Sequence, residues 1–149
     1  MAPKQRRWQL ISFDLDGTLV DTAAEIAEAA NRVLEAHGLA RRSPAQITLF
    51  VGAGTHELIR RLHALCEQDE PGLAERVPVS SLLSAMDRHY QDTTGTVAQP
   101  YAGCRDMLDR LKQAGLRLAC VTNKELRHAR RVLEVTALDG CFELVIGGD

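Results

Sequence analysis

The sequence LISFDLDGTLVDT, residues 10–22, places Asp14 and Asp16 directly after a short apolar run. The run WQLISF, residues 8–13, indicates a buried β-strand, because it is short, apolar and followed by turn-forming residues. Two like charges at the end of such a strand repel each other, and the repulsion is tolerable where a cation binds or a proton is transferred. This stretch therefore predicts a strand that ends in a chemically active loop.

The residues that follow carry a helical pattern. Ile26, Val33 and Leu34 share one face of a helix predicted over 22–37. Thr22 and Glu25 have the spacing of a capping box, and Gly38 is a natural stop. Further helices are predicted from the Ser43-Pro44 cap to the GAG at 52–54, from Thr55 onward, and over about 80–92. No strand signal interrupts residues 21–96, which we expect to form an all-helical module.

From Pro100 onward the pattern changes to alternating helices and strands. Helices are predicted over 104–114 and 125–135, and strands over 116–121 and 142–148. A strand, a crossover helix and a second strand are typical of a parallel sheet. The N-terminal strand has to join that sheet, because a lone strand is not stable. The sequence thus predicts an α/β core formed by residues 1–20 and 97–149, into which residues 21–96 are inserted.

Composition narrows the classes of function. The chain has 149 residues, is 45% hydrophobic and 26% charged, and carries a net charge of −2. This weak charge and an aromatic content of 4% disfavour nucleic-acid partners and anionic membranes. With no signal-peptide pattern and no apolar run long enough to span a bilayer, we expect no membrane association and a cytoplasmic location. The cysteines lie far apart in apolar segments and are expected to be reduced core residues: Cys66, Cys104, Cys120 and Cys141.

Two polar clusters are predicted to meet at one edge of the sheet. Asp14 and Asp16 follow the first strand, and the run Thr122-Asn123-Lys124 follows the second. In open parallel sheets, ligands bind at the carboxyl ends of the strands. One carboxylate can serve as a nucleophile or metal ligand while its neighbour transfers a proton. The backbone N–H of Gly17 can approach an anion, and the Thr122 hydroxyl can donate to it, so the site suits a phosphate together with Mg²⁺.

The paired aspartates have two simpler interpretations. A calcium loop would use Asp14, Asp16, Thr18 and Glu25, but Leu19 stands where that loop requires glycine, and a strand precedes it instead of a helix. The aspartates could also be turn formers only. The polar run after the second strand, CVTNK at 120–124, favours a binding site over a simple turn.

Taken together, FDLDGTLVDT and CVTNK resemble the motifs of the haloacid dehalogenase superfamily of phosphohydrolases. Within it, the whole chain, including PYAGCRDMLDRLKQAGLRLACVTNK and the closing VIGGD, is similar to the bacterial phosphoglycolate phosphatases. The resemblance implies a Rossmann-like core with an inserted helical cap. It also implies a phosphatase that hydrolyses a small phosphate monoester, with 2-phosphoglycolate as the favoured substrate.

The resemblance further implies roles for individual residues. Asp14 would be the nucleophile that forms an aspartyl-phosphate, and Asp16 would protonate the leaving alcohol and then activate water. Asp14 and the backbone carbonyl of Asp16 would hold Mg²⁺, and Thr122, with Asn123 beside it, would bind the phosphoryl group. Lys124 is expected to be peripheral, with a role toward a substrate carboxylate conceivable. The loop Val51, Gly52, Ala53 and Gly54 is either a substrate-selecting segment that closes over the site or a plain helix break.

The chain departs from the family pattern at its end. The family's lysine motif and its acidic metal-binding pair would follow the GGD at 147–149, where this sequence stops. We therefore expect a C-terminally truncated core, weak activity, and either self-association through an exposed sheet edge or marginal stability. A phosphosugar mutase on the same scaffold and a non-catalytic association fragment remain alternatives.

Overall fold

The computed structural model describes residues 9–149, and it contains a parallel three-stranded sheet of order β1-β4-β5. The strands are β1 (Leu10–Phe13), β4 (Arg117–Val121) and β5 (Leu144–Ile146). They are shorter than predicted at some ends, and the expected start of β1 at Trp8 lies outside the described residues. The α/β fold class is confirmed.

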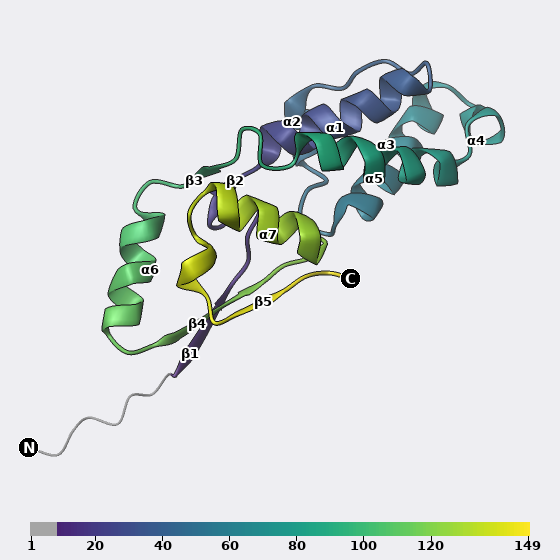
Figure 1. Cartoon of the computed structure of the whole chain (residues 1–149). Helices are drawn as coiled ribbons and strands as arrows, with labels where there is room; N and C mark the ends of the chain where they lie inside the picture. The colour runs from purple at the N-terminus through teal and green to yellow at the C-terminus, as the bar shows by residue number, and fades with distance from the viewer. Residues whose placement is uncertain (1–8) are drawn as a thin grey trace, which may run out of the picture.

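Five helices form one end of the molecule, and the sheet with two more helices forms the other (Figure 1). The first group consists of α1 (Ala23–Ala36), α2 (Pro44–Thr48), α3 (Thr55–Asp69), α4 (Leu73–Arg76) and α5 (Val79–Thr93). The second group consists of α6 (Cys104–Gln113) and α7 (Leu126–Val135), with a short 3₁₀ turn at Asp139–Cys141. Of these, only α4 has no counterpart in the prediction, which assigned a loop around Pro71 and Gly72.

Each group of elements has its own hydrophobic interior. One cluster lies within residues 26–90 and contains Leu34, Ile59 and Met86, none of which is exposed. The other combines residues 15–20 with residues 104–141, including Leu118 of β4 and Leu133 of α7. The cysteines predicted to be reduced core residues are free and buried in these interiors.

Helices cover only one face of the sheet. In parallel pairing, partner residues lie on the same face, so Leu118 and Cys120 of β4 share a face with Ile11 and Phe13 of β1. That face packs in the cluster that includes α6 and α7 residues. The opposite face carries apolar side chains that are 43–54% exposed: Leu10, Val121, Leu144 and Ile146.

A short ribbon joins the two ends of the molecule. The strands β2 (Val20–Asp21) and β3 (Gln99–Pro100) pair antiparallel, next to the chain's entry into α1 and shortly after its exit from α5. No pattern in the sequence predicts this ribbon. Each strand has only two residues, so neither leaves a periodic pattern in the sequence.

The predicted capping box at the start of α1 is wrong. The Thr22 side chain makes no cap hydrogen bond, and its hydroxyl donates instead to Asp16 Oδ1 over 2.5 Å. Glu25 turns inward, and its carboxylate accepts a hydrogen bond from the Gly95 N–H over 2.9 Å. The capping box at Ser43 and Gln46, by contrast, is complete. Distant partners thus replace the local ones at the first helix.

Candidate functional site

A small pocket lies where the carboxyl ends of β1 and β4 meet the helical end of the molecule. Five of its lining residues come from the two polar clusters of the sheet: Asp14, Asp16, Thr122, Asn123 and Lys124. The rest come from the helical end: Ile26, Val51, Gly52, Gly54, Thr55 and Leu58. Its free volume is about 20 Å³, room for about one water molecule.

Among the charged residues that line the pocket, Asp14 makes the fewest polar contacts. It directly follows β1, is exposed, and has no hydrogen bond or ion pair to any residue within 9–149. Because β1 pairs in parallel with β4, its end is held beside the end of β4, where the second polar cluster begins. Asp14 thus presents a free carboxylate at the mouth of the sheet.

Asp16, in contrast, is firmly held. Its Oδ1 atom accepts a hydrogen bond from the Thr22 hydroxyl and lies 3.0 Å from Lys124 Nζ. The side chain is 12% exposed, so solvent weakens this ion pair little. The two carboxylates of the D-x-D pattern therefore differ in kind: one is free and one is fixed by a hydroxyl and an ammonium group.

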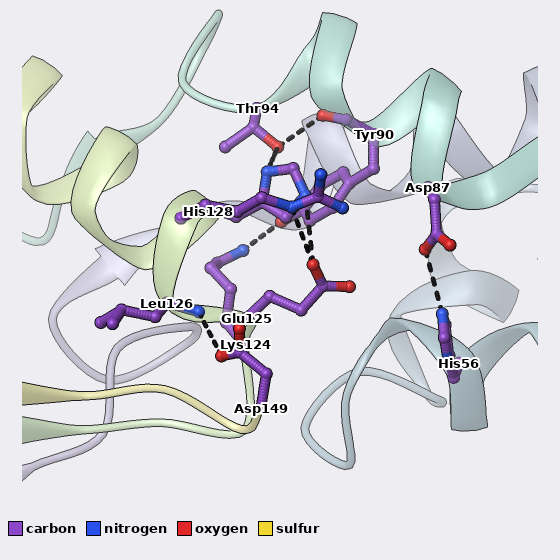
Figure 2. A network of polar contacts seen from close by, with 10 residues as sticks. His56, Asp87, Tyr90, Thr94, Lys124, Glu125, Leu126, His128 and Asp149 are labelled. Atoms are coloured by element: carbon purple, nitrogen blue, oxygen red, sulfur yellow. Dashed lines mark hydrogen bonds and ion pairs between the residues drawn. The ribbon is translucent and has the colours of Figure 1, made fainter.

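The expectation that Lys124 is peripheral is wrong. Lys124 is 3% exposed, and its ammonium group contacts both Asp16 and the hydroxyl of Tyr90, as Figure 2 shows for Tyr90. The nitrogen also lies 4.7 Å from the centre of the Tyr90 ring. Burial raises the pKa of the Tyr90 phenol, which therefore stays protonated. The partners of Lys124 are distant in sequence, so no local pattern could have revealed its burial.

Thr122 and Asn123 follow β4 and behave differently from each other. Thr122 is 6% exposed; its N–H donates to the Ile146 carbonyl over 3.0 Å, and its hydroxyl oxygen accepts from the Lys124 N–H over 3.2 Å. The hydroxyl proton is left to point at a ligand. The Asn123 amide is engaged, because its Nδ2 donates to the Gly52 carbonyl over 2.7 Å. In this conformation Asn123 holds the helical end closed over the pocket.

Two of the predicted site residues lie outside this pocket. Gly17 does not line it, and its N–H donates to the Val20 carbonyl over 2.9 Å. The turn uses this donor here, and the phosphate-binding role of Gly17 stays a prediction. Ala53 lines a neighbouring hollow, whereas the other members of its loop, Val51, Gly52 and Gly54, line the pocket itself.

The pocket residues fit a hard divalent cation, although incompletely. The Asp14 carboxylate has no protein partner within residues 9–149, and no hydrogen bond there uses the Asp16 carbonyl oxygen. Oxygen atoms of this kind are the ligands that Mg²⁺ prefers. Asp16 Oδ1 is less suitable, since the Lys124 ammonium already neutralises it. Two free oxygens and surrounding water would make a weak Mg²⁺ site.

Comparison with known proteins agrees with this geometry. Residues 11–149 match the family described as haloacid dehalogenase-like hydrolase. A plasmid-encoded phosphoglycolate phosphatase of Cupriavidus necator is 37% identical over 139 residues, and that of Agrobacterium fabrum is 37% identical over 140. The alignments cover 93% and 94% of this chain. The chain spans 58% of the length of each of these relatives.

A solved structure supports the same assignment. The crystal structure of a predicted phosphoglycolate phosphatase from Haemophilus somnus superimposes with a TM-score of 0.88 at 29% identity. The match covers 97% of this chain and 64% of that one. Because the family match extends over nearly the whole chain, the chain belongs to the haloacid dehalogenase-like hydrolases.

Proposed function

We propose that this chain carries the nucleophile-bearing part of an Mg²⁺-dependent phosphatase that hydrolyses a small phosphate monoester, with 2-phosphoglycolate as the favoured substrate. The observation that carries the proposal is that Thr122 lines one pocket with Asp14 and Asp16, although it lies far from both in sequence. The names of the relatives support the substrate class, although the chain spans 58% of the length of the two cited.

The chemistry follows from the difference between the two aspartates. The free Asp14 carboxylate would attack phosphorus and form an aspartyl-phosphate while the bond to the leaving alcohol breaks. Asp16 would give that alcohol a proton and would later take one from the attacking water. Thr122 would donate its hydroxyl to a phosphoryl oxygen, where negative charge develops. Bound Mg²⁺ would neutralise phosphoryl charge, with Asp14 and the Asp16 carbonyl as its protein ligands.

Lys124 gives this pocket a cation at its inner end. Its ammonium group holds Asp16 in place and contributes positive charge to a pocket that must accept an anion. A carboxylate beside the phosphate of a small substrate would lie toward this ammonium group, whereas the phosphate ester of an uncharged sugar has no such second anion. The loop 51–54 would select the substrate, since opening it is necessary for entry.

We propose that the chain turns over slowly. Within residues 9–149 the carboxylates lining the pocket are Asp14 and Asp16 alone, and the latter is paired with Lys124. Loss of one charge-stabilising group costs about 3–4 kcal/mol in transition-state free energy, and phosphate monoesters are among the slowest substrates to hydrolyse unaided. A weak Mg²⁺ site therefore predicts slow phosphate release.

The test is release of phosphate from 2-phosphoglycolate by the 149-residue chain, with Mg²⁺ and with a chelator. We expect slow, Mg²⁺-dependent release that falls to background in Asp14→Asn and Asp16→Asn. Asp106→Asn, an exposed aspartate on α6, is the matched control and should retain the rate. Release that persists in Asp14→Asn would overturn the proposal.

Further arms of this experiment separate the alternatives. Conversion of a phosphosugar isomer without net phosphate release would identify a mutase. Radiolabel that stays on Asp14 without turnover would identify a chain that accepts phosphate but does not hydrolyse it. A rate equal to that of a complete relative would contradict the proposed slow turnover.

We also propose that residues 1–20 and 97–149 act as a core domain and residues 21–96 as a helical cap. The two hydrophobic interiors support this division. Limited proteolysis should cut first in the connecting segments, near residues 20 and 97. Early cuts inside α3 or α5 would contradict it.

Self-association through the sheet is a further part of the proposal. In the described chain β1 is an edge strand, and the open face beside it carries Leu10, Val121, Leu144 and Ile146. Analytical ultracentrifugation should show a dimer that Leu10→Lys dissociates, whereas Leu49→Lys, at a leucine 78% exposed on the helical end, should not. A monomer at all concentrations would contradict association.

A nucleic-acid partner is not proposed, and a cytoplasmic location stays a prediction. Among residues 9–149, no helix has the length and apolar character needed to cross a bilayer.

A further inference from the structure

A second group of chemically active side chains lies outside the pocket, where the helical end meets the start of α7. It contains His56 of α3, Asp87 of α5 and Glu125, which precedes α7 (Figure 2). One ligand atom from each lies within 4.8 Å of the others. These residues line no part of the pocket that holds Asp14. We propose that this group, the junction cluster, binds a divalent first-row transition metal ion such as Zn²⁺, with His128 of α7 facing its Glu125.

The spacing of the donor atoms suits one ion. His56 Nε2 and Asp87 Oδ1 are 3.0 Å apart. In a tetrahedral Zn²⁺ site with bonds of about 2.1 Å, the ligand atoms lie about 3.4 Å apart. The donor atoms of His56, Asp87 and Glu125, which lie within 4.8 Å of one another, would therefore have to approach by at most about 1.4 Å to bind one ion. An imidazole with carboxylates favours a transition metal over Mg²⁺, which prefers oxygen alone.

His128 supplies an independent indication that a ligand belongs here. It is 4% exposed, and its Nε2 is buried without a hydrogen-bond partner within residues 9–149. The Thr94 hydroxyl has a single proton, which it donates to the Tyr90 carbonyl over 2.5 Å. Its oxygen, 3.2 Å from His128 Nδ1, therefore accepts the imidazole N–H. This leaves the lone pair on Nε2.

That lone pair is directed at the junction cluster. His128 Nε2 lies 3.9 Å from Glu125 Oε2, and Figure 2 shows the imidazole facing the glutamate. Two lone pairs that face each other need a cation or a proton between them. A metal ion would satisfy both groups.

One cation already competes for this position. Arg127 Nε lies 2.9 Å from Glu125 Oε2, in an ion pair whose arginine side chain is 53% exposed. An exposed pair of this kind is weak, so a divalent ion can displace it. Removal of the Arg127 charge should therefore tighten metal binding, which a purely structural role for Glu125 would not predict.

Metal binding at this position would link the two ends of the molecule. His56 and Asp87 belong to helices that pack in the cluster within residues 26–90, whereas Glu125 and His128 belong to the segment that follows β4. An ion held by both would restrain the separation that opens the pocket. It should also stabilise the folded chain, because ligands that bind only the folded state raise its stability.

The test is titration of the untagged 149-residue chain with ZnCl₂ by isothermal calorimetry, in an Asp14→Asn background that removes the free pocket carboxylate. We expect one Zn²⁺ per chain. His56→Ala and Glu125→Gln should each weaken binding at least tenfold, and Arg127→Gln should tighten it severalfold. His89→Ala, at a histidine outside the cluster, is the matched control and should bind like the parent.

Two further measurements keep the result independent of variant folding. Zn²⁺ should shift the ¹⁵N resonances of both His56 and His128 in the parent chain, and Mg²⁺ should not. Absence of Zn²⁺ binding would overturn the proposal, as would equal affinity in His56→Ala or a His128 resonance that does not move. Loss of phosphatase activity in Asp14→Asn with retained Zn²⁺ binding would show that this site and the proposed catalytic site are separate.

Discussion

The helical end of the molecule encloses its apolar side chains, whereas the sheet encloses only half of them. Within residues 26–90 the interior side chains are at most 3% exposed. Across the sheet, the face toward α6 and α7 is buried, but the opposite face leaves Leu144 54% and Ile146 46% exposed. A helix can bury its single apolar stripe against one neighbour, while a sheet has two faces and needs a layer on each. The helical end therefore buries its apolar side chains by itself, whereas the second face of the sheet stays exposed in the described chain.

The largest expected effect tests this contrast directly with three leucines. Leu62→Ala in α3 removes a side chain with no exposure, and Leu118→Ala in β4 removes one that is 1% exposed. Each should lower the free energy of unfolding by about 2–5 kcal/mol. Leu144→Ala, on the open face, should cost less than about 1 kcal/mol.

Urea unfolding followed by circular dichroism measures these differences. Leu118 is the informative control, because it separates the effect of the covered face from a general weakness of the sheet. If Leu144→Ala costs as much as Leu118→Ala, the open face is covered in solution, and a second copy of the chain becomes the first candidate to cover it.

The next effect concerns the ion pair of Lys124 with Asp16, which lies between the two ends of the molecule and is largely buried. Lys124→Met removes the ammonium group from Asp16 and Tyr90 and leaves a carboxylate whose side chain is 12% exposed. Breaking a fully buried pair costs about 3–5 kcal/mol, and the partial exposure of Asp16 reduces this to about 1–3 kcal/mol.

Urea unfolding at neutral pH measures the loss, with Lys124→Arg as a variant that keeps the charge. The double variant Lys124→Met with Asp16→Asn should recover part of the stability, because no unpaired charge remains. Losses that simply add in the double variant would show that the two groups do not interact.

A smaller effect is expected at the loop that closes the pocket. Asn123→Ala removes the hydrogen bond to the Gly52 carbonyl, worth about 0.5–1.5 kcal/mol. Because this bond joins the sheet to the loop 51–54, its loss should favour the open state of the pocket.

Hydrogen exchange resolved by mass spectrometry should then show faster exchange in residues 51–54, with no change in α3. Gln91→Ala, an exposed amide removed from α5, is the matched control. Unchanged exchange at the loop would mean that other contacts keep the pocket closed.

Local pattern predicted most of this architecture, and its failures share one physical cause. The strands β1, β4 and β5 and the longer helices follow from the periodicity of apolar residues. The contacts that escaped prediction join residues far apart in sequence: Thr22 bonds Asp16 in place of its own helix, and Lys124 turns inward to reach Tyr90. A capping pattern describes only the hydrogen bonds that a side chain can make within its own helix. In the folded chain, Thr22 and Lys124 contact residues from other segments.

The candidate site was predictable for a different reason. Asp14, Asp16 and Thr122 meet because parallel strands bring their carboxyl ends to one edge, a consequence of topology that the sequence already indicates. The use of the Gly17 N–H within the turn after β1 could not be predicted, because it depends on hydrogen bonding that periodicity does not report. The sequence thus predicted that these three residues meet, but not which hydrogen-bond donors beside them are already used.

The smallest expected effect concerns Glu25, which lies at the same junction but inside the first helix. The side chain is 1% exposed, and burial raises the pKa of its carboxyl group, opposed by the Gly95 N–H and the charge of Lys124. A folded-state pKa above the unfolded value of about 4.5 stabilises the fold at low pH. That contribution is lost as the pH rises through the folded-state pKa, since the unfolded chain then gives up its proton more readily.

Glu25→Gln keeps the size and shape of the side chain and removes its ionisable carboxyl group. Relative to the parent chain, the variant should therefore gain stability as the pH is raised from 4 to 8, measured as the difference in free energy of unfolding in urea. Glu35→Gln, an exposed position on the same helix, gives the baseline for exchanging a carboxyl for an amide. If the stability difference shrinks with rising pH, the Lys124 charge stabilises the Glu25 carboxylate more than burial destabilises it. Lys124 would then stabilise two carboxylates, those of Asp16 and Glu25.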